Sequence, residues 1–284
     1  MNSVSDTPLI KENRISRLTS SLECLHEYQY DREKQKNCVL KLYNSHSEKG
    51  VFRGMIITTL GMLGLIIGSG HVITPSENGY LLLKSNKIAN QFYFDTARSI
   101  FYEIDYSKFA FLEIIGSKET TTFSDLASTI ADRKSGDKYS KSSSMERARR
   151  WVNLLGSLDF VDINGEVISI NKGVVERTEL ERNNTLGRKD DFYLTVLSAY
   201  SNLASKTDGI VDIEELRCKV SIQLMDTHRL IVTRGLFDHM FRLMPVETDR
   251  YRIIFGHPMG KGEKLYSYNG NVYSTVYIKA KGGD

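Results

Sequence analysis

Proline and cysteine are scarce in this sequence of 284 residues, which has four prolines and three cysteines. A chain with so few prolines and no low-complexity tract does not have the composition of a long disordered region. The cysteines, Cys24, Cys38 and Cys218, are odd in number, and none belongs to a CxxC pair. Their spacing predicts neither a disulfide framework nor a zinc site, and it favours a reducing compartment. We therefore expect a cytoplasmic protein.

Long hydrophobic runs are also missing. The most apolar stretch, 55–67, is about 13 residues long, whereas a helix that spans a bilayer needs roughly 20. The polar segment 1–8 has no basic region of the kind that opens a secretory signal. The sequence therefore predicts neither a membrane segment nor a membrane partner.

Charge of one sign does not dominate, because the net charge is only +3. Hydrophobic residues make up 40% and charged residues 26% of the chain, which is ordinary for a globular protein. Any surface that binds a polyanion must therefore be local.

Motifs for catalysis are few. The Gly-Lys-Gly run at 260–262 lacks the spacing of a phosphate-binding loop, and 208–216 is better explained by a helix cap at Asp212 than by a calcium loop. The acidic residues Asp105 and Glu113 lack the spacing of a metal-dependent nuclease site. We assign no catalytic residue, metal site or cofactor, and the sequence favours a binding protein over an enzyme. If the chain is an enzyme, a metal-dependent DNA endonuclease is the expected class.

A basic loop and helix occupy residues 133–150. A helix is expected over 144–158, followed by a hairpin over 160–171 around the Asn164-Gly165 step, which is a strong turn signal. Spacing places Arg147, Arg150 and Leu154 on one side of the helix and Trp151, Leu155 and Leu158 on another, which leaves a cationic face free. The candidate DNA-binding residues here are Arg133, Lys134, Lys138, Lys141, Ser143, Arg147, Arg149 and Arg150.

The order of two helices, a basic helix and a hairpin is typical of a winged helix, in which the third helix enters the major groove. Similar orders predict three units: a first over 1–84, a second over 85–171 that includes a connecting helix, and a third over 172–284 that begins with a charged linker. The expected fold class is mainly α with small β-wings (α+β), built as tandem winged-helix units. In the third unit, a helix over 227–243 would present Arg229 and Arg234, and a Gly-rich wing would present Lys261 and Lys264.

The segment 51–84 carries an apolar helix that ends Leu63-Gly-Leu-Ile, followed by a wing and the run Thr74-Pro-Ser-Glu, which we expect to start a helix with Thr74 as its cap. This segment resembles a winged-helix unit of the DNA-recognition regions of FokI-like type IIS restriction endonucleases. The resemblance implies a DNA-recognition function in a restriction or defence system.

The expected function is sequence-specific binding of double-stranded DNA, in a restriction, defence or mobile-element system, with the helix 144–158 in the major groove. Two alternatives stay open. The chain could be a winged-helix scaffold or dimerisation subunit of an SMC-type or other multiprotein complex, with a homodimer or a partner subunit as its contact. It could also be the recognition part of a nuclease.

Overall fold

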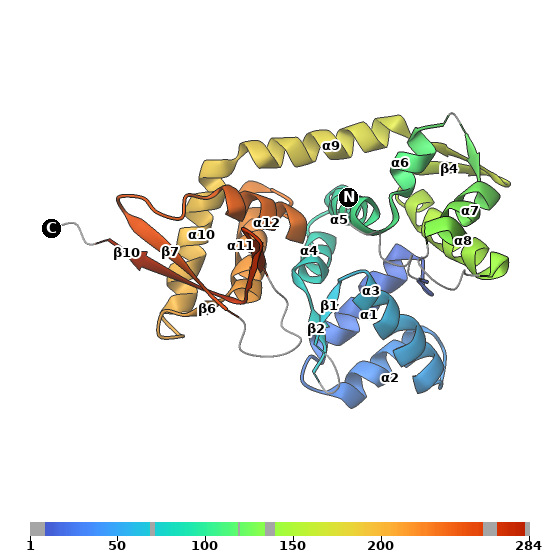
Figure 1. The fold of residues 1–284 in the computed structure, drawn as a ribbon. Coiled ribbons are helices and arrows are strands. Elements are labelled where there is room, and N and C mark those ends of the chain that lie inside the picture. The colour runs from blue at the N-terminus through green and yellow to red at the C-terminus, as the bar shows by residue number, and fades with distance from the viewer. Residues whose placement is uncertain (1–8, 69–71, 119, 134–139, 258–265, 282–284) are drawn as a thin grey trace. The chain divides into compact units, whose positions relative to one another are not determined.

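The computed structural model describes residues 9–68, 72–118, 120–133, 140–257 and 266–281. The chain forms two compact units, 1–180 and 181–284, whose boundary falls inside a long helix (Figure 1). Each unit is described by itself below.

The first part of unit 1 is mainly helical and contains a small hairpin whose two strands have two residues each. Helix α1 packs against α2, and the π-helical segment η1 continues directly into the short helix α3. Strands β1 and β2 pair antiparallel, with Ile66 opposite Pro75, and α4 follows. The bounds are α1 Ile15–Glu27, α2 Arg32–Leu42, η1 Glu48–Ile57, α3 Thr58–Met62, β1 Ile66–Ile67, β2 Thr74–Pro75 and α4 Glu77–Asn86.

Local signals set several of these ends. The Ser47 side chain accepts a hydrogen bond from the Gly50 amide and caps η1, and Gly64 follows α3 with a φ of 67°, a left-handed conformation that suits glycine. The predicted helix start near residue 75 is real, but Thr74 as its cap was wrong. Ser76 caps α4 by accepting from the Gly79 amide, because Thr74 and Pro75 are held in β2.

A disulfide joins Cys24 of α1 to Cys38 of α2, with 5.7 Å between their Cα atoms. The expectation of a chain without disulfides was therefore wrong. The cysteines are 14 residues apart in sequence, but the turn between α1 and α2 makes the helices antiparallel neighbours and brings the two side chains together. Cys218 is in no disulfide.

The second part of unit 1 combines four α-helices with a three-stranded sheet. Helix α7 packs against α8, and the sheet has the strand order β3-β5-β4, with both pairings antiparallel. The predicted hairpin is confirmed, since Asn164 and Val167 pair across the turn at Gly165. The bounds are α5 Asn90–Ile104, η2 Asp105–Phe109, α6 Phe111–Gly116, β3 Thr121–Thr122, α7 Phe123–Arg133, α8 Lys141–Gly156, β4 Val161–Asn164 and β5 Val167–Ile170.

Asp105 holds the centre of this part together. Its carboxylate is buried and accepts hydrogen bonds from the amides of Phe111 and Leu112, at 3.3 and 2.9 Å, which caps α6. It also accepts from the indole nitrogen of Trp151 in α8 at 2.6 Å. One buried carboxylate thus ties α6 to α8, while the Trp151 ring stacks on Phe109 with 3.8 Å between ring centroids.

Helix α9 links this part to unit 2, so the charged segment predicted as a linker is helical. In unit 2, β6, β10 and β7 form an antiparallel sheet in the order β6-β10-β7, and β8 pairs with β9 in a separate hairpin. The bounds are α9 Lys172–Gly187, α10 Lys189–Ala204, β6 Val211–Asp212, α11 Ile213–His228, α12 Arg234–Leu243, β7 Tyr251–Gly256, β8 Tyr266–Tyr268, β9 Asn271–Tyr273 and β10 Thr275–Ala280.

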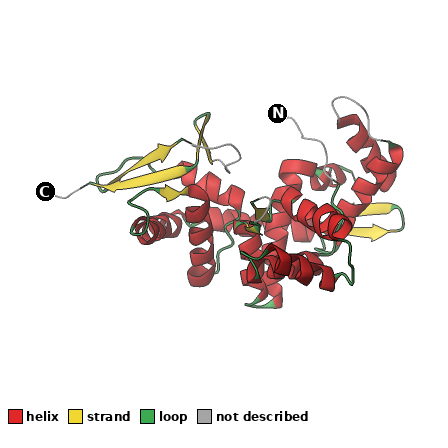
Figure 2. Ribbon diagram, turned by 90° about the horizontal axis from the view of Figure 1, so that it is seen from below, coloured by secondary structure: helices red, strands yellow, loops and turns green. Residues whose placement is uncertain are grey.

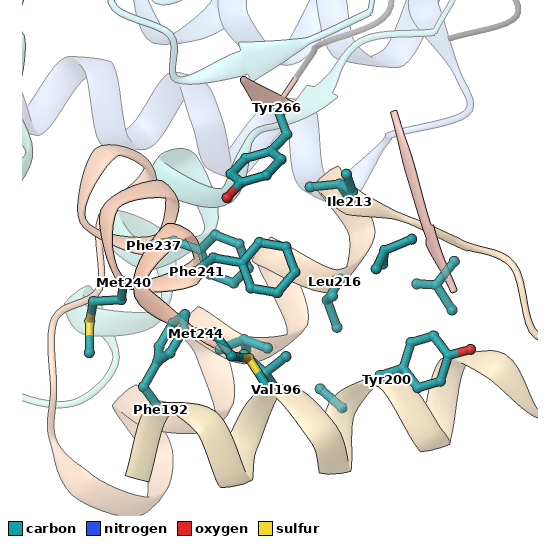
Figure 3. Close-up of a cluster of buried hydrophobic side chains, with 14 of the residues drawn as sticks. Phe192, Val196, Tyr200, Ile213, Leu216, Phe237, Met240, Phe241, Met244 and Tyr266 are labelled. Carbon is teal, nitrogen blue, oxygen red and sulfur yellow. The ribbon is translucent and has the colours of Figure 1, made fainter. Parts of the chain in front are cut away.

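The core of unit 2 lies between its helices and its sheet. Phe192, Val196 and Tyr200 point from α10 into this core (Figure 3). Phe237 and Phe241 of α12 meet them, with ring centroids of Phe192 and Phe237 5.3 Å apart. Burying several large aromatic side chains is the main stabilising contribution to so small a unit.

The two sheets have the same construction. In each, a two-residue strand precedes two helices, and the last strand of the sheet lies between this first strand and the strand that directly follows the helices, giving β3-β5-β4 and β6-β10-β7. The protein is mainly helical with small antiparallel sheets, so the α+β fold class is confirmed (Figure 2). In the described parts of the chain, every helix is too short or too polar to cross a lipid bilayer.

Candidate nucleic-acid interface

Helix α8 extends from the N-cap Ser140, whose hydroxyl accepts from the Ser143 amide at 3.2 Å. Its apolar residues Trp151, Val152 and Leu155 are buried. A stripe of exposed residues spaced by three or four positions runs along the opposite side; we call it the α8 stripe, and it consists of Ser142, Glu146, Arg149 and Asn153. Arg147 and Arg150 flank this stripe and are half-buried.

The predicted faces of this helix need one correction. Leu154 does not share an exposed side with Arg147 and Arg150, because it is fully buried. The apolar face of α8 is wider than the spacing indicated, since α7 and the hairpin β4–β5 both pack on it. Arg149 therefore lies at the centre of the free side, and the other two arginines lie at its edges.

The Arg149 guanidinium has two neighbours. It forms an ion pair with Glu166 at the hairpin turn, at 2.7 Å, and it lies over the Phe123 ring, 5.5 Å from the centroid. The Arg149 and Glu166 side chains are 51% and 62% exposed, so both partners stay in contact with water. This contact joins the helix to the hairpin without burying charge.

Arg150 is held more closely. It forms an ion pair with Glu146, one turn earlier, at 2.8 Å, and it donates a hydrogen bond to the backbone carbonyl of Lys11 at 2.5 Å. Its side chain is 33% exposed. Arg149 and Arg150 thus already have acidic partners within the chain, a feature that sequence spacing did not show.

The remaining candidates near α8 divide into two groups. Lys141 is exposed in the first turn of α8, and Ser143 is half-buried with its amide used in the cap. Arg133 ends α7, but its side chain lies outside the described residues, as do Lys134 and Lys138. The structure thus places Lys141, Ser143 and the three arginines on one helix.

The candidates of unit 2 do not share a helix. The predicted helix over 227–243 was wrong at its start, because α11 continues to His228 and ends with Arg229 in a left-handed conformation (φ 57°). Arg229 is exposed in the connection before α12, whereas Arg234 opens α12 and pairs with Glu214 at 3.3 Å. Lys261 and Lys264 lie outside the described residues.

A buried cation was missed in unit 2. Arg217 of α11 is fully buried and binds Glu214 at 2.6 Å and Asp238 of α12 at 2.8 Å. Hydrophobic periodicity does not predict this buried arginine, because a charged residue on an apolar helix face interrupts the spacing of the apolar residues. Its role is to fix α12 against α11.

Three cations of unit 2 act on His239 of α12. Burial lowers the pKa of His239, and the positive charges of Arg242, Arg182 and Lys189 lower it further. Cations from α9, α10 and α12 therefore act on one imidazole within unit 2. The predicted helix over 227–243 includes His239 and Arg242, whereas no pattern in the sequence places Arg182 and Lys189 near them.

Chemically, these surfaces offer guanidinium and ammonium groups, and such groups bind phosphate or the edge of guanine. Among the described residues, no group of three histidine, cysteine or acidic side chains is arranged to hold a metal ion. Comparison of the chain with protein-family models, with curated proteins and with solved structures finds no match.

Proposed function

We propose that this chain binds double-stranded DNA, with α8 in the major groove and the basic residues of 133–141 against the phosphates. The observation that carries the proposal is the position of α8. It is the third helix of a helix–strand–helix–helix–hairpin arrangement, and its free side carries Arg149 with Lys141 at its N-terminal end. A winged helix uses its third helix in this way.

The strand order supports a winged-helix interpretation. A short first strand pairs with the last strand of the hairpin in β3-β5-β4, and the same order recurs as β6-β10-β7. We propose that residues 85–171 and 172–284 each contain a winged-helix unit. Within the first 84 residues, the described part has α1, α2, the joined segments η1 and α3, the hairpin β1–β2 and most of α4, but its β1–β2 sheet has two strands. We propose them as a reduced version of the same unit.

The ion pairs of Arg149 and Arg150 are compatible with this role. Exposed pairs contribute about 0–1 kcal/mol, and a phosphate or guanine can take the place of a carboxylate. Glu166 and Glu146 then act as counter-charges for the helix in the absence of DNA. Arg229, Arg234 and the positive surroundings of His239 would extend the footprint along the duplex.

The biological setting that we propose, a restriction, defence or mobile-element system, rests on the resemblance of 51–84 to recognition regions of type IIS endonucleases. Such a chain would work as the recognition part of a nuclease or as a separate DNA-binding protein. Adding Mg²⁺ or Mn²⁺ to the DNA complex and analysing the DNA on a gel tests cleavage.

The triple variant Arg147→Ala, Arg149→Ala, Arg150→Ala tests the proposed helix. A fluorescent random duplex is titrated with wild type and variant by anisotropy at two salt concentrations. We expect the variant to bind at least about tenfold more weakly at low salt, because each phosphate or base contact is worth about 1 kcal/mol or more.

The control removes the same three charges elsewhere. Lys41, Lys172 and Lys206 are exposed at or near the ends of α2, α9 and α10, so a triple alanine variant there changes net charge equally. If the control weakens binding as much as the arginine variant, then general charge, and not α8, determines affinity. An arginine variant that binds like wild type contradicts the choice of helix.

A scaffold role is the second candidate, and the internal ion pairs of Arg149 and Arg150 favour it. A helix whose cations are already neutralised can serve as a structural element in a complex with other proteins. The same titration separates the two functions, since a scaffold shows no duplex binding even at low salt.

A further inference from the structure

A cavity of about 500 Å³ opens in unit 2 between helix α10 and one end of the sheet β6-β10-β7. The helix contributes residues spaced by three or four positions from Leu197 to Ala204, which therefore share one side of it. The sheet contributes the start of β7 and the end of β10. All of these residues belong to one compact unit, so the cavity is a feature of unit 2 alone.

The cavity lies where the core of unit 2 runs out of large side chains. Ile253 of β7 pairs with Ile278 of β10, and both are buried in the core. Two positions further along, Tyr251 pairs with Ala280 on the same face of the sheet, because alternate residues of a strand share a face. The small side chains of Ala280 and Ala204 leave the space between sheet and helix unfilled at this end.

Two hydroxyl groups of the wall are already in use. The Tyr200 hydroxyl donates to the Gly209 carbonyl at 2.6 Å, which fixes the Tyr200 ring at one end of the row of core side chains on α10 (Figure 3). The Ser205 hydroxyl donates to the Asn202 carbonyl at 3.0 Å. These two groups shape the cavity and are not available to a ligand.

Three other lining residues carry donors that are available. The Arg250 guanidinium, the Tyr251 hydroxyl and the Ser201 hydroxyl form no hydrogen bond or ion pair with another described residue. Among the described residues that line the cavity, Arg250 is the one charged residue, and no aspartate or glutamate is present. Donors together with a positive charge suit a ligand that accepts hydrogen bonds and is negatively charged.

The end of α10 opposes an anion only weakly. Carbonyl groups at the C-terminus of a helix carry partial negative charge, which disfavours an anion nearby. Here the Leu203 carbonyl accepts from the Lys206 amide, and the Ala204 carbonyl accepts from the Gly209 amide. Because these carbonyls have partners, the full positive charge of Arg250 dominates the cavity.

We propose that this cavity binds a small organic carboxylate with an apolar body. The carboxylate lies against Arg250, since a guanidinium matches a carboxylate through two parallel hydrogen bonds. The apolar body lies between Leu197 of α10 and Ile278 of β10, beside the Tyr200 ring. Apolar walls with a few placed polar groups are typical of ligand sites. The site contains no residue of α8, and it does not rest on the proposed DNA binding.

The test uses the intact protein without DNA. Ligand-observed proton NMR at constant ionic strength measures the affinity for phenylacetate and for phenylacetamide, a neutral molecule of nearly the same shape. We expect phenylacetate to bind at least about fivefold more tightly, because hydrogen bonds to a charged acceptor are about twice as strong as neutral ones.

Three variants locate the site. Arg250→Gln should remove the preference for phenylacetate, and Ser201→Leu should weaken its binding because leucine fills part of the cavity and removes a donor. Both residues are exposed, so neither change disturbs the core. The control Lys279→Gln removes the same charge from an exposed residue of β10 whose side chain lies on the other face of the sheet, and it should bind like wild type.

A preference for phenylacetate that depends on Arg250 but not on Lys279 supports the proposal. Equal affinity for the two ligands, no saturable response to phenylacetate, or the same loss in Lys279→Gln as in Arg250→Gln overturns it, and so does a Ser201→Leu variant that binds like wild type. A chain that binds phenylacetate but no duplex DNA keeps this site and contradicts the proposed function, so the two proposals fail separately.

Discussion

At the residue scale, Arg149 joins two elements. It connects α8, the helix that we propose to contact DNA, to the hairpin β4–β5. Its guanidinium is shared between Glu166 and the Phe123 ring, and both contacts leave it accessible to water. An arginine held in this way is already oriented, so less side-chain entropy is lost when a phosphate or base replaces the carboxylate. In the proposed complex, Glu166 is the residue that competes with DNA for Arg149.

Removing the Glu166 charge should therefore strengthen DNA binding. In Glu166→Gln the Arg149 guanidinium no longer has a charged partner, and we expect the duplex affinity to rise by about two- to fivefold, the range of an exposed ion pair. The control Asp162→Asn removes the same charge from the exposed β4 residue of that hairpin. Anisotropy titrations of both variants at one salt concentration check the difference, and equal affinities of the two variants contradict the competition.

His239 gives unit 2 a pH dependence. Burial, then Arg242, Arg182 and Lys189, hold its pKa below the ordinary value of 6.5. The unfolded chain therefore binds a proton more readily, and the free energy of unfolding falls as the pH drops through 6.5 toward the lower folded pKa. Urea denaturation at pH 7.5 and 5.5 should show a larger loss of the free energy of unfolding for wild type than for His239→Gln. Identical losses would contradict the role of His239 in this pH dependence.

At the element scale, a buried polar contact joins two helices in each of the proposed units 85–171 and 172–284. Asp105 joins α6 to Trp151 of α8, and Arg217 joins α11 to Asp238 of α12. A helix that binds DNA must keep its position when DNA contacts its exposed side. A buried, directional hydrogen bond or ion pair fixes the position of one helix against another better than apolar packing alone. These contacts were not predictable from the sequence, because they link residues 46 and 21 positions apart.

Removing Arg217 should destabilise unit 2 strongly. Arg217→Ala leaves Glu214 and Asp238 without their buried partner, and we expect a loss of about 3–5 kcal/mol in the free energy of unfolding. Urea denaturation followed by far-ultraviolet circular dichroism measures this loss. The exposed neighbour Lys219→Ala should change stability by less than about 0.5 kcal/mol. A cost for Arg217→Ala as small as that of the control would contradict the role of this network.

The link between α1 and α2 is covalent. Because Cys24 and Cys38 are joined, iodoacetamide should label one cysteine, Cys218, in unfolded but unreduced protein and three after reduction. Mass spectrometry counts the labels, and three without reduction would contradict the bond. Replacing both residues by serine should lower the stability of unit 1 by about 2–4 kcal/mol through the unfolded state.

At the scale of the whole molecule, sequence reasoning was most successful where structure is local. The Asn164-Gly165 hairpin and the Asp212 cap are confirmed, because turn and cap chemistry depends on a few adjacent residues. It failed where distant segments meet. The disulfide, the burial of Leu154 and the pairing of Arg149 with Glu166 all depend on how helices pack.

The candidate site was predicted in part for the same reason. Local composition located the basic helix, and the structure places five of the candidates on α8. The packing of α7 and the hairpin on α8 decides which of these candidates face solvent. Residue spacing alone left this open. The separation of Arg229 from α12 follows from the end of α11 at His228, where no glycine or proline marks the stop.

The salt dependence of duplex binding tests the central claim most directly. If α8, the basic residues before it and the cations of unit 2 neutralise about six phosphates, the logarithm of the binding constant should fall with the logarithm of salt concentration with a slope of about −5. Anisotropy titrations of wild type from low to moderate salt give this slope, and the triple arginine variant should give a shallower one. Absence of duplex binding at low salt, or a binding constant that does not change with salt, contradicts the account.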